Sequence, residues 1–215
     1  VFSEIHMRRT KADALQTRES LLDAAETLFA QQGVSRTSLQ DIARAAGCTR
    51  GAIYWHFKDK ADLFNAMMAR TTLPMEDGLA QLDAPGRTDP LADVLQSSMN
   101  VFHQIVHDPR TRRVFDIATL KIELVAELDG VRRRHIEVQK DCAQHIGHCL
   151  ARAQAAGLVR PELEPATLTL TLLAIVNGLI QNWMLEPGRF DLCEVGARSL
   201  ALFLDGIRPQ AGVAR

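Results

Sequence analysis

Apolar residues recur along almost the whole chain at the spacing of one face of an α-helix. Between residues 21 and 29 they stand three or four positions apart, and Gly33 then supplies a C-terminal stop. Strand signals, in which apolar and polar residues alternate between turns, are nearly absent. The pattern predicts an all-α protein of about nine helices, with a small N-terminal domain and a larger C-terminal one.

The segment RTSLQDIARAAG, residues 36–47, predicts a second and very short helix. Thr37 and Gln40 have the spacing of a capping box. The apolar positions that follow form a buried stripe, and Gly47 ends the helix. We therefore expect a helix of only about two turns.

A third helix is expected directly after this one. Thr49 is the predicted N-cap, and the helix runs to about Phe57. A turn of about three residues joins the two helices, which is the helix-turn-helix arrangement. Asp59 then caps a fourth helix.

Acid–proline pairs mark three later helix starts, because an acid suits the N-cap and proline suits the first helical position. The pairs are Asp89-Pro90, Asp108-Pro109 and Glu164-Pro165. A further helical segment extends from about Lys121 to Ala156 and is stopped by Gly157. Asp129-Gly130 is expected to bend this helix or to delay its start.

Residues 165–185 are apolar almost all round, so one face of that helix is expected to meet something beyond its own domain. A second subunit is the simplest occupant. A last amphipathic helix from about Leu192 to Leu204 would join it in a four-helix contact across a two-fold axis. The alternative is that both helices are central core of a monomer.

Composition limits the classes of protein that remain. The 215 residues are 47% hydrophobic and 24% charged, as in soluble globular proteins, and no uninterrupted apolar run reaches membrane-spanning length. We expect Met7 to be the natural first residue and leave residues 1–6 out of the fold prediction. The four cysteines show no C-x-x-C spacing and the sequence shows no signal peptide, so we expect free thiols in the cytoplasm. We expect no cofactor.

The net charge of −1 hides a small asymmetry. Residues 7–70 hold ten Lys and Arg against seven Asp and Glu, a balance of +3, and residues 71–215 hold fifteen against eighteen, a balance of −3. Such an imbalance does not establish nucleic-acid binding, because phosphate binding depends on where the charges lie.

The segment CTRGAIYWHFKDK, residues 48–60, places cationic and polar side chains together in one short stretch. A helix that enters a major groove needs small residues where its backbone approaches the duplex and polar side chains that reach phosphates and base edges. Gly51 and Ala52 keep one side thin, and Arg50 offers bidentate donors to guanine. The expected phosphate ligands are Thr49, Tyr54, His56 and, from the first turn of the fourth helix, Lys60.

Two further features complete this expectation. Ile53 and Phe57 point into the three-helix core, on the side opposite the DNA-facing residues. Arg8, Arg9 and Lys11 form a basic arm that either adds phosphate or minor-groove contacts or is merely solvated.

The stretch RTSLQDIARAAGCTRGAIYWHFKDKADLF, residues 36–64, resembles the helix-turn-helix of the TetR family of bacterial transcriptional regulators. The family pattern is met by Thr37, Asp41-Ile42-Ala43, Ala46-Gly47, Gly51, Tyr54, His56-Phe57 and Lys60. Together with the opening RRTKADALQTR, it is similar to the AcrR-type branch, whose members repress multidrug efflux operons. The resemblance is weaker beyond residue 70.

This resemblance implies a ligand-responsive repressor that binds operator DNA as a homodimer. It implies a DNA-binding domain over residues 7–58 and a ligand-binding and dimerisation domain over 59–210, linked through a fourth helix at 59–78. Two recognition helices related by a two-fold axis read half-sites about 34 Å apart. The candidate DNA-binding residues are Arg36, Thr37, Ser38, Thr49, Arg50, Gly51, Ala52, Tyr54, Trp55, His56 and Lys60.

The C-terminal domain of such a repressor is expected to enclose a small hydrophobic or amphipathic inducer in an apolar cavity. Asn177 is predicted to lie among aliphatic side chains, where its amide meets the ligand or makes a structural hydrogen bond. For most of the other candidates, plain core packing is the alternative role. The full set is Val94, Ser97, Ser98, Val101, Phe115, Thr119, Cys142, Ile146, Leu173, Val176, Asn177 and Ile180.

Other functions were weighed on the same residues. Cys142, His145 and Cys149 share one helical face, which leaves a metal or thiol sensor as an alternative, although a fourth zinc ligand is not evident. Catalysis is excluded because no phosphate-binding glycine motif, G-x-S-x-G or H-E-x-x-H is present. A regulator of another pathway, an activator and a helical adaptor remain as alternatives.

Overall fold

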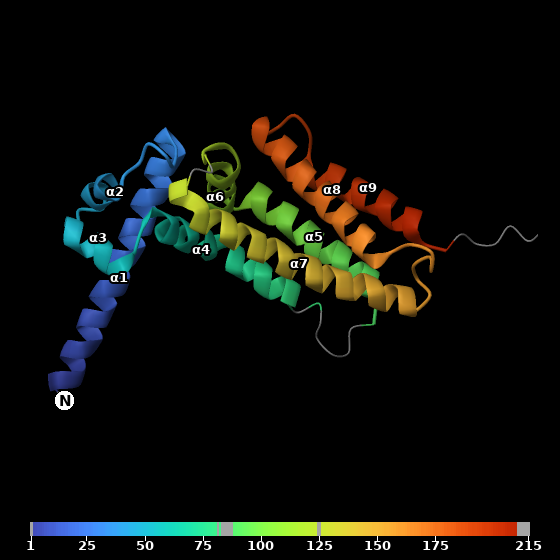
Figure 1. Cartoon of the computed structure of the whole chain (residues 1–215), viewed down its shortest axis with the longest axis horizontal. Coiled ribbons are helices and arrows are strands. Elements are labelled where there is room, and N and C mark those ends of the chain that lie inside the picture. Colours follow the sequence, from blue (N-terminus) through green and yellow to red (C-terminus); the bar gives the residue numbers. More distant parts are fainter. Residues whose placement is uncertain (1, 81, 83–87, 124–125, 210–215) are drawn as a thin grey trace, which may run out of the picture. The chain divides into compact units, whose positions relative to one another are not determined.

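The computed structural model describes residues 2–80, 82, 88–123 and 126–209; at 2–10, 72–75, 77, 80 and 127 it describes the backbone alone. Within these ranges it has nine α-helices, one short 3-10 helix and no strand, which confirms the all-α class (Figure 1). The elements are α1 (Phe2–Gln32), α2 (Leu39–Ala45), α3 (Arg50–His56), α4 (Lys60–Ala80), α5 (Pro90–His107), α6 (Pro109–Leu120), η2 (Ala126–Leu128), α7 (Asp129–Ala155), α8 (Pro165–Leu185) and α9 (Leu192–Ile207).

Most helix ends lie where local chemistry places them. Gly33, Gly47 and Gly157, which follow α1, α2 and α7, adopt φ of +85°, +68° and +74°, a region that suits a residue without Cβ. Asp89 caps α5 by accepting the Ala92 N–H at 3.0 Å. These helix ends agree with the sequence predictions.

Two helix starts differ in detail from the predictions. Helix α8 begins at Pro165, directly after Glu164, as predicted. The Glu164 carboxylate, however, accepts no backbone N–H of the helix and instead accepts from the Thr167 hydroxyl at 3.0 Å. The helix that was expected from about residue 121 begins only at Asp129, as the Asp129-Gly130 pair allowed.

The N-terminal residues also differ from expectation. Helix α1 begins at Phe2, so residues 2–6 are helical although their sequence has no helical periodicity. Arg8, Arg9 and Lys11 therefore lie on a helix and do not form a separate arm. The side chain of Lys11 is exposed, as a solvated or DNA-facing lysine requires.

The chain divides into two compact units. Unit 1 consists of residues 1–71 and 113–135, and unit 2 of residues 72–112 and 136–215. Helices α4, α6 and α7 each contribute residues to both units. The functional boundary expected at residue 58 stays a prediction, because the compact units are defined by packing alone.

Unit 1 has a core that extends beyond the three N-terminal helices. The buried side chains of α1 to α4 pack with Val114 and Ile117 of α6 and with Val131 of α7. The backbone adds a direct link, since the Val34 N–H donates to the carbonyl of Lys121 at 3.0 Å. The late part of α6 and the start of α7 are therefore structural components of the helix-turn-helix unit.

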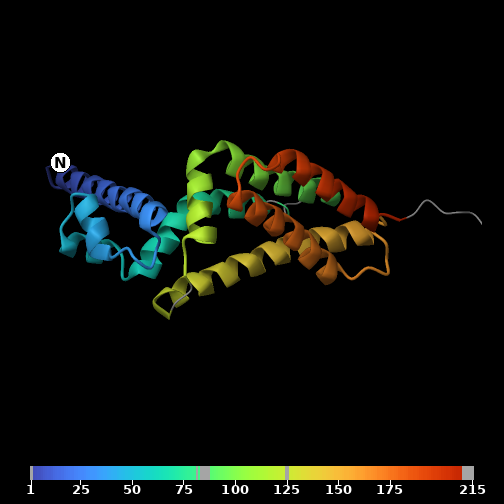
Figure 2. The same cartoon turned by 90° about the horizontal axis from the view of Figure 1, so that it is seen from above.

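In unit 2, α9 packs against both α5 and α8 (Figure 2). Helices α5 and α9 approach very closely where Gly196 lies on the ring of Phe102. A Cβ added at Gly196 would be 2.4 Å from Cε2 of that ring, so only glycine permits this spacing. Both residues are buried.

Helix α8 remains unusually exposed for its composition. By length and composition it is able to cross a membrane, and only 33% of its most apolar stretch is buried within the chain. One such helix is weak evidence for a membrane span, because core helices of soluble proteins pass the same test. Leu170 and Leu185 of α8 are 67% and 69% exposed, and Leu202 of α9 is 75% exposed.

Candidate nucleic-acid interface

Helix α2 is capped one residue later than the sequence predicted. Ser38, and not Thr37, is the N-cap, and its hydroxyl accepts the Asp41 N–H at 3.1 Å. The Asp41 carboxylate accepts the Ser38 N–H at 3.2 Å, which completes a capping box with Asp41 in place of Gln40. These bonds from Ser38, with Arg44 nearby, lower the pKa of Asp41 despite partial desolvation.

Helix α3 begins and ends as predicted. The Thr49 hydroxyl accepts the Ala52 N–H at 3.2 Å, and Phe57 closes the helix. Ile53 and Phe57 are buried in the core of unit 1, which confirms the expected inward face. The opposite face is therefore held outward by the burial of these two side chains.

The outward face of α3 carries polar and aromatic side chains. Tyr54 is 51% exposed and Trp55 is 74% exposed, and Arg50 is exposed beside them. The Arg50 guanidinium lies 5.8 Å from the centroid of the Tyr54 ring. This pair presents a fork of N–H donors next to a hydroxyl, a combination suited to base edges and phosphates.

The first turn of α3 is thin. Gly51 is exposed, and a Cβ added there would meet only the Thr49 hydroxyl oxygen, at 3.9 Å. The fold itself therefore does not require glycine at this position. Ala52 is half-buried and adds only a methyl group. A neighbouring backbone is able to approach this turn closely.

His56 ends α3 at the edge of the exposed face. Its ring meets the Trp55 ring edge to face, with centroids 4.6 Å apart. Burial, with a smaller contribution from the Arg18 guanidinium, lowers the pKa of His56 below its ordinary value of 6.5. The neutral imidazole therefore prevails at neutral pH and offers one N–H donor.

Two residues that were predicted to contact DNA, Lys60 and Thr37, lie inside unit 1. Lys60 is only 6% exposed, and its Nζ donates to the carbonyls of Val34 at 3.2 Å and Ser35 at 3.4 Å. Thr37 is buried, and its hydroxyl donates to the Gly33 carbonyl at 2.8 Å. Both side chains join the turn after α1 to its neighbours, so a phosphate contact by either one would require it to leave these partners.

The exposed cation that the sequence reasoning missed is Lys58. Its side chain is exposed, and its backbone N–H donates to the Asp62 carboxylate at 3.0 Å. Asp59 caps α4 as predicted, because its carboxylate accepts the Asp62 N–H at 2.8 Å. The sequence contained a sign of this difference. Lys58 precedes the N-cap Asp59 and so lies outside α4, whereas Lys60 is the first residue of that helix. Arg36 and Ser38 are also exposed.

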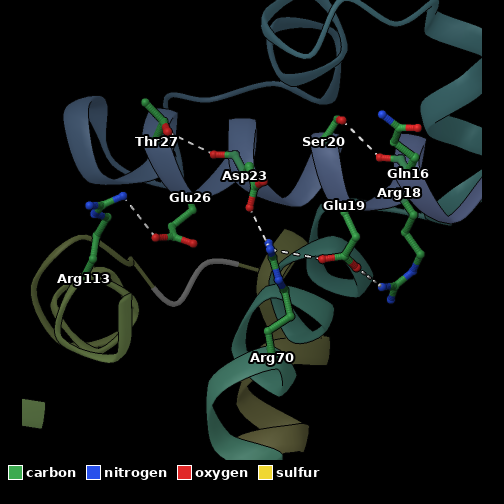
Figure 3. A network of polar contacts seen from close by, with 9 residues as sticks. All are labelled: Gln16, Arg18, Glu19, Ser20, Asp23, Glu26, Thr27, Arg70 and Arg113. Atoms are coloured by element: carbon green, nitrogen blue, oxygen red, sulfur yellow. Dashed lines mark hydrogen bonds and ion pairs between the residues drawn. The ribbon is translucent and has the colours of Figure 1, made fainter. Parts of the chain in front are cut away.

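Two arginines attach other helices of unit 1 to α1 (Figure 3). Nη2 of Arg70, on α4, lies 2.7 Å from the Asp23 carboxylate and 3.1 Å from that of Glu19. Nη1 of Arg113, on α6, lies 3.2 Å from the buried Glu26 carboxylate. Both bridges lie within two residues of the points where α4 and α6 pass into unit 2.

The structure distributes the predicted inducer-binding residues between the units. Phe115 and Thr119 belong to unit 1, and the other ten belong to unit 2. Asn177 is exposed on α8 and not enclosed among aliphatic side chains, so that expectation is wrong for the single chain. The buried members are Val94, Ser98, Ile146 and Ile180; the half-buried ones are Ser97, Val101, Phe115, Thr119, Cys142, Leu173 and Val176.

The cysteine alternative on α7 loses support. None of the four cysteines forms a disulfide. Burial, with the Glu76 and Asp141 carboxylates nearby, raises the pKa of Cys142 to about 11, so its thiol stays protonated and unreactive at neutral pH. Cys142 and Cys149 are seven residues apart on α7, which places them about 10 Å apart along the axis, too far to share a metal ion.

Comparison with known proteins agrees with this architecture. Residues 21–67 match "Bacterial regulatory proteins, tetR family", and residues 89–208 match "MAATS-type transcriptional repressor, C-terminal region". The transcriptional regulator TtgR of Pseudomonas putida is 38% identical over 187 residues, which cover 86% of this chain and 89% of TtgR.

Two solved structures of repressors are also similar. NalD, the secondary repressor of the MexAB-OprM multidrug efflux pump in Pseudomonas aeruginosa, is 32% identical with a TM-score of 0.84, covering 93% of this chain and 100% of NalD. SmeT, the repressor of the Stenotrophomonas maltophilia pump SmeDEF, is 31% identical in its triclosan complex with a TM-score of 0.82, covering 91% and 93%. From the exposed recognition helix and these matches, we conclude that the chain is a regulator and not an enzyme, and that it belongs to the tetR family of bacterial regulatory proteins.

Proposed function

We propose that this protein is a cytoplasmic repressor that binds double-stranded operator DNA through α3 and leaves it when a small hydrophobic or amphipathic inducer binds. The observation that carries this proposal is the two-sided character of α3. Ile53 and Phe57 fix the helix in the core, while Arg50, Tyr54 and Trp55 face outward around a thin first turn. A major groove accepts a helix of this kind.

The DNA contacts follow from exposure. Arg50 reads a base edge, and Thr49, Tyr54, Ser38 and Lys58 hold phosphates on either side, because each of these side chains is exposed. The remaining candidates, Arg36, Trp55 and His56, border this surface. Thr37 and Lys60 act by positioning the helix-turn-helix from inside.

The functional unit is a homodimer formed through α8 and α9. The three large aliphatic side chains that these helices leave exposed, Leu170, Leu185 and Leu202, are the kind of surface that a second copy buries. A two-fold dimer places two copies of α3 for successive half-sites. A second copy that covers α8 also accounts for the apolar surface of this helix without a membrane.

The regulated genes are those of a multidrug efflux operon and the repressor's own gene. The support is the efflux-pump repression named for NalD and SmeT, which resemble this chain over nine-tenths of its length. The complex of SmeT with triclosan supports an apolar inducer in this protein too. The candidate inducer contacts are the eleven residues predicted from sequence that are buried or half-buried. Asn177 is left out because it is exposed in the single chain.

Release from DNA follows a shift between two conformations. Helices α4 and α6 run from unit 2 into unit 1, and each fastens α1 through an arginine, Arg70 or Arg113. A tilt of either helix caused by the inducer therefore moves α1 and the α3 packed on it. The two recognition helices then no longer match successive grooves.

The test is a DNA shift assay with the fragments upstream of the protein's own gene and of the neighbouring genes. Specific binding is expected, with release on adding triclosan, the compound bound in the SmeT complex. Arg50→Ala should lose about 1–3 kcal/mol of discrimination, or roughly 5- to 150-fold in specific affinity. The matched control is Arg132→Ala, because Arg132 is an exposed arginine of unit 1 paired with Asp129 at 2.8 Å.

Equal loss of binding in both arginine variants, or binding to the upstream fragment no tighter than to random duplex, would contradict the assignment of α3. Circular dichroism of both variants checks that each remains folded. A reporter assay in cells distinguishes repression from activation.

A further inference from the structure

Two histidines and a cysteine of unit 2 meet on the surface between α5 and α9. The side-chain ligand atoms of His103, His107 and Cys193 all lie within 4.8 Å of one another. The imidazole rings of His103 and His107 are stacked, with centroids 5.3 Å apart. Both histidines are exposed and Cys193 is half-buried, so an ion in solution has access to the group.

The helices hold these side chains in place. His103 and His107 are four residues apart on α5 and therefore lie on one face of it. Cys193 is in the first turn of α9, one helical turn before Gly196. Since Gly196 packs directly on Phe102, the neighbour of His103, the closest approach of α5 and α9 fixes the distance between the cysteine and the histidines.

We propose that His103, His107 and Cys193 form a Zn²⁺ site that joins α5 to α9. Imidazole nitrogen and thiolate sulfur are the ligands that zinc prefers. Tetrahedral bonds of about 2.0–2.3 Å separate ligand atoms by about 3.3–3.8 Å, so the three side chains need to close by only about 1 Å. Rotation of the exposed histidines supplies this movement.

The site has three protein ligands and leaves a fourth position to water, as in zinc sites that exchange ligands. One carboxylate acts on the site: Asp191, which caps α9 by accepting the Glu194 N–H at 2.9 Å, interacts electrostatically with Cys193. Burial, with a smaller contribution from the Asp191 carboxylate, raises the pKa of the Cys193 thiol, so zinc must displace a proton when it binds.

This inference goes beyond operator binding and inducer release. A zinc ion that crosslinks α5 to α9 stabilises unit 2 against unfolding, because it binds only the folded arrangement. It also ties the helix expected in the dimer interface to a helix that contributes inducer contacts, Val94 to Val101. Zinc would therefore modulate repression from a site that neither DNA nor inducer occupies.

The experiment is metal titration of the full-length, reduced and chelator-stripped protein. Co²⁺ is the spectroscopic probe, and Zn²⁺ affinity is measured by competition with a chromophoric chelator. We expect one Co²⁺ per chain with a thiolate-to-cobalt charge-transfer band, and displacement of Co²⁺ by Zn²⁺. We also expect the melting temperature to rise with Zn²⁺.

Variants identify the ligands. Cys193→Ser should abolish the charge-transfer band, and His103→Gln and His107→Gln should each weaken Zn²⁺ binding at least about tenfold. Cys193→His keeps a ligand and should retain Zn²⁺ while losing the band. The controls are Cys142→Ser and His148→Gln, which change the same residue types on α7.

A band that survives Cys193→Ser, or Zn²⁺ affinity that is equal in the wild type and both α5 histidine variants, overturns the site. Each variant's melting temperature without metal shows that it is folded. Operator binding is measured separately on the stripped protein. A failed zinc site therefore leaves the proposed repressor function standing, and a failed operator assay leaves the metal result standing.

Discussion

Helices α3 and α8 both expose large side chains in the single chain, but the chemistry of those side chains differs. Helix α3 exposes Arg50, Tyr54 and Trp55, which tolerate water and offer donors and rings. Helix α8 exposes Leu170 and Leu185, which offer only apolar surface. The exposed face of α3 is suited to reversible binding of a polar partner, and that of α8 to a permanent apolar interface.

The difference extends to how each helix is fixed. Helix α3 is seven residues long and is positioned by its cap and by two buried side chains, so its outward face is determined within one chain. Helix α8 is three times as long, and the described residues of the chain leave much of its apolar surface exposed. Surface chemistry therefore indicates the class of partner before any partner is seen.

The largest expected effect comes from charging the apolar surface. The double variant Leu170→Glu, Leu202→Glu should be monomeric by light scattering, because two buried carboxylates oppose the dimer. Operator affinity should fall at least about 100-fold, since a second half-site no longer adds avidity. Leu158→Glu, at an exposed leucine in the α7–α8 connection, is the control. A dimeric double variant would refute the α8–α9 interface.

A smaller effect is expected on the thin side of α3. Gly51→Ala meets only ordinary contact in the chain and should stabilise the folded protein by up to about 1 kcal/mol. The added methyl group should nevertheless lower operator affinity several-fold, because it stands where DNA approaches. Thermal unfolding and the shift assay measure the two effects. Higher stability with unchanged operator affinity would show that DNA does not approach this turn.

The two lysines beside α3 should respond in opposite ways. Lys58→Ala should reduce the slope of log affinity against log salt by about one and leave stability unchanged, because Lys58 is exposed. Lys60→Met should lower the free energy of unfolding by about 1–3 kcal/mol, because the Val34 and Ser35 carbonyls lose the ammonium donor, although Val34 retains the Thr37 N–H. Urea unfolding separates these cases. A lost salt slope in Lys60→Met, with none in Lys58→Ala, would restore the sequence-based assignment.

The smallest expected effect is a titration. The pKa of Asp41 is expected below its ordinary value of 3.8, and Ser38→Ala should raise it toward that value by removing the hydroxyl bond. Because the folded pKa is lowered, this carboxylate stabilises α2 above pH 3.8 and the stabilisation is lost as the pH falls through the lowered pKa. NMR titration of the carboxyl carbon measures both. An unshifted Asp41 in the wild type would show that the capping box is not formed in solution.

Much of the fold was predictable because its signals are local. Proline after an acid starts α5, α6 and α8, and glycines with positive φ follow α1, α2 and α7. The capping box was predicted one residue early, since Thr37 and Ser38 are both good N-caps and each has a suitable partner three residues later. Burial decides between them: Thr37 bonds to the Gly33 carbonyl, which leaves Ser38 to cap α2.

The parts that could not be predicted depend on contacts distant in sequence. No periodicity in residues 113–135 reveals that Val114, Ile117 and Val131 pack with the N-terminal helices. Similarly, an all-apolar helix gives no sign of which stripe faces inward, so Asn177 was assigned to the wrong side. The metal-ligand spacing noticed on α7 was local, whereas the histidines and cysteine that meet come from α5 and α9.

The bond between the Val34 N–H and the Lys121 carbonyl uses main-chain atoms alone. The bond itself requires no particular side chain at position 34 or 121, although proline at position 34 would remove its donor. Substitutions of neighbouring side chains that keep the backbone in place therefore preserve this hydrogen bond. The link between the end of α6 and the turn after α1 therefore depends on backbone geometry and on no particular side chain.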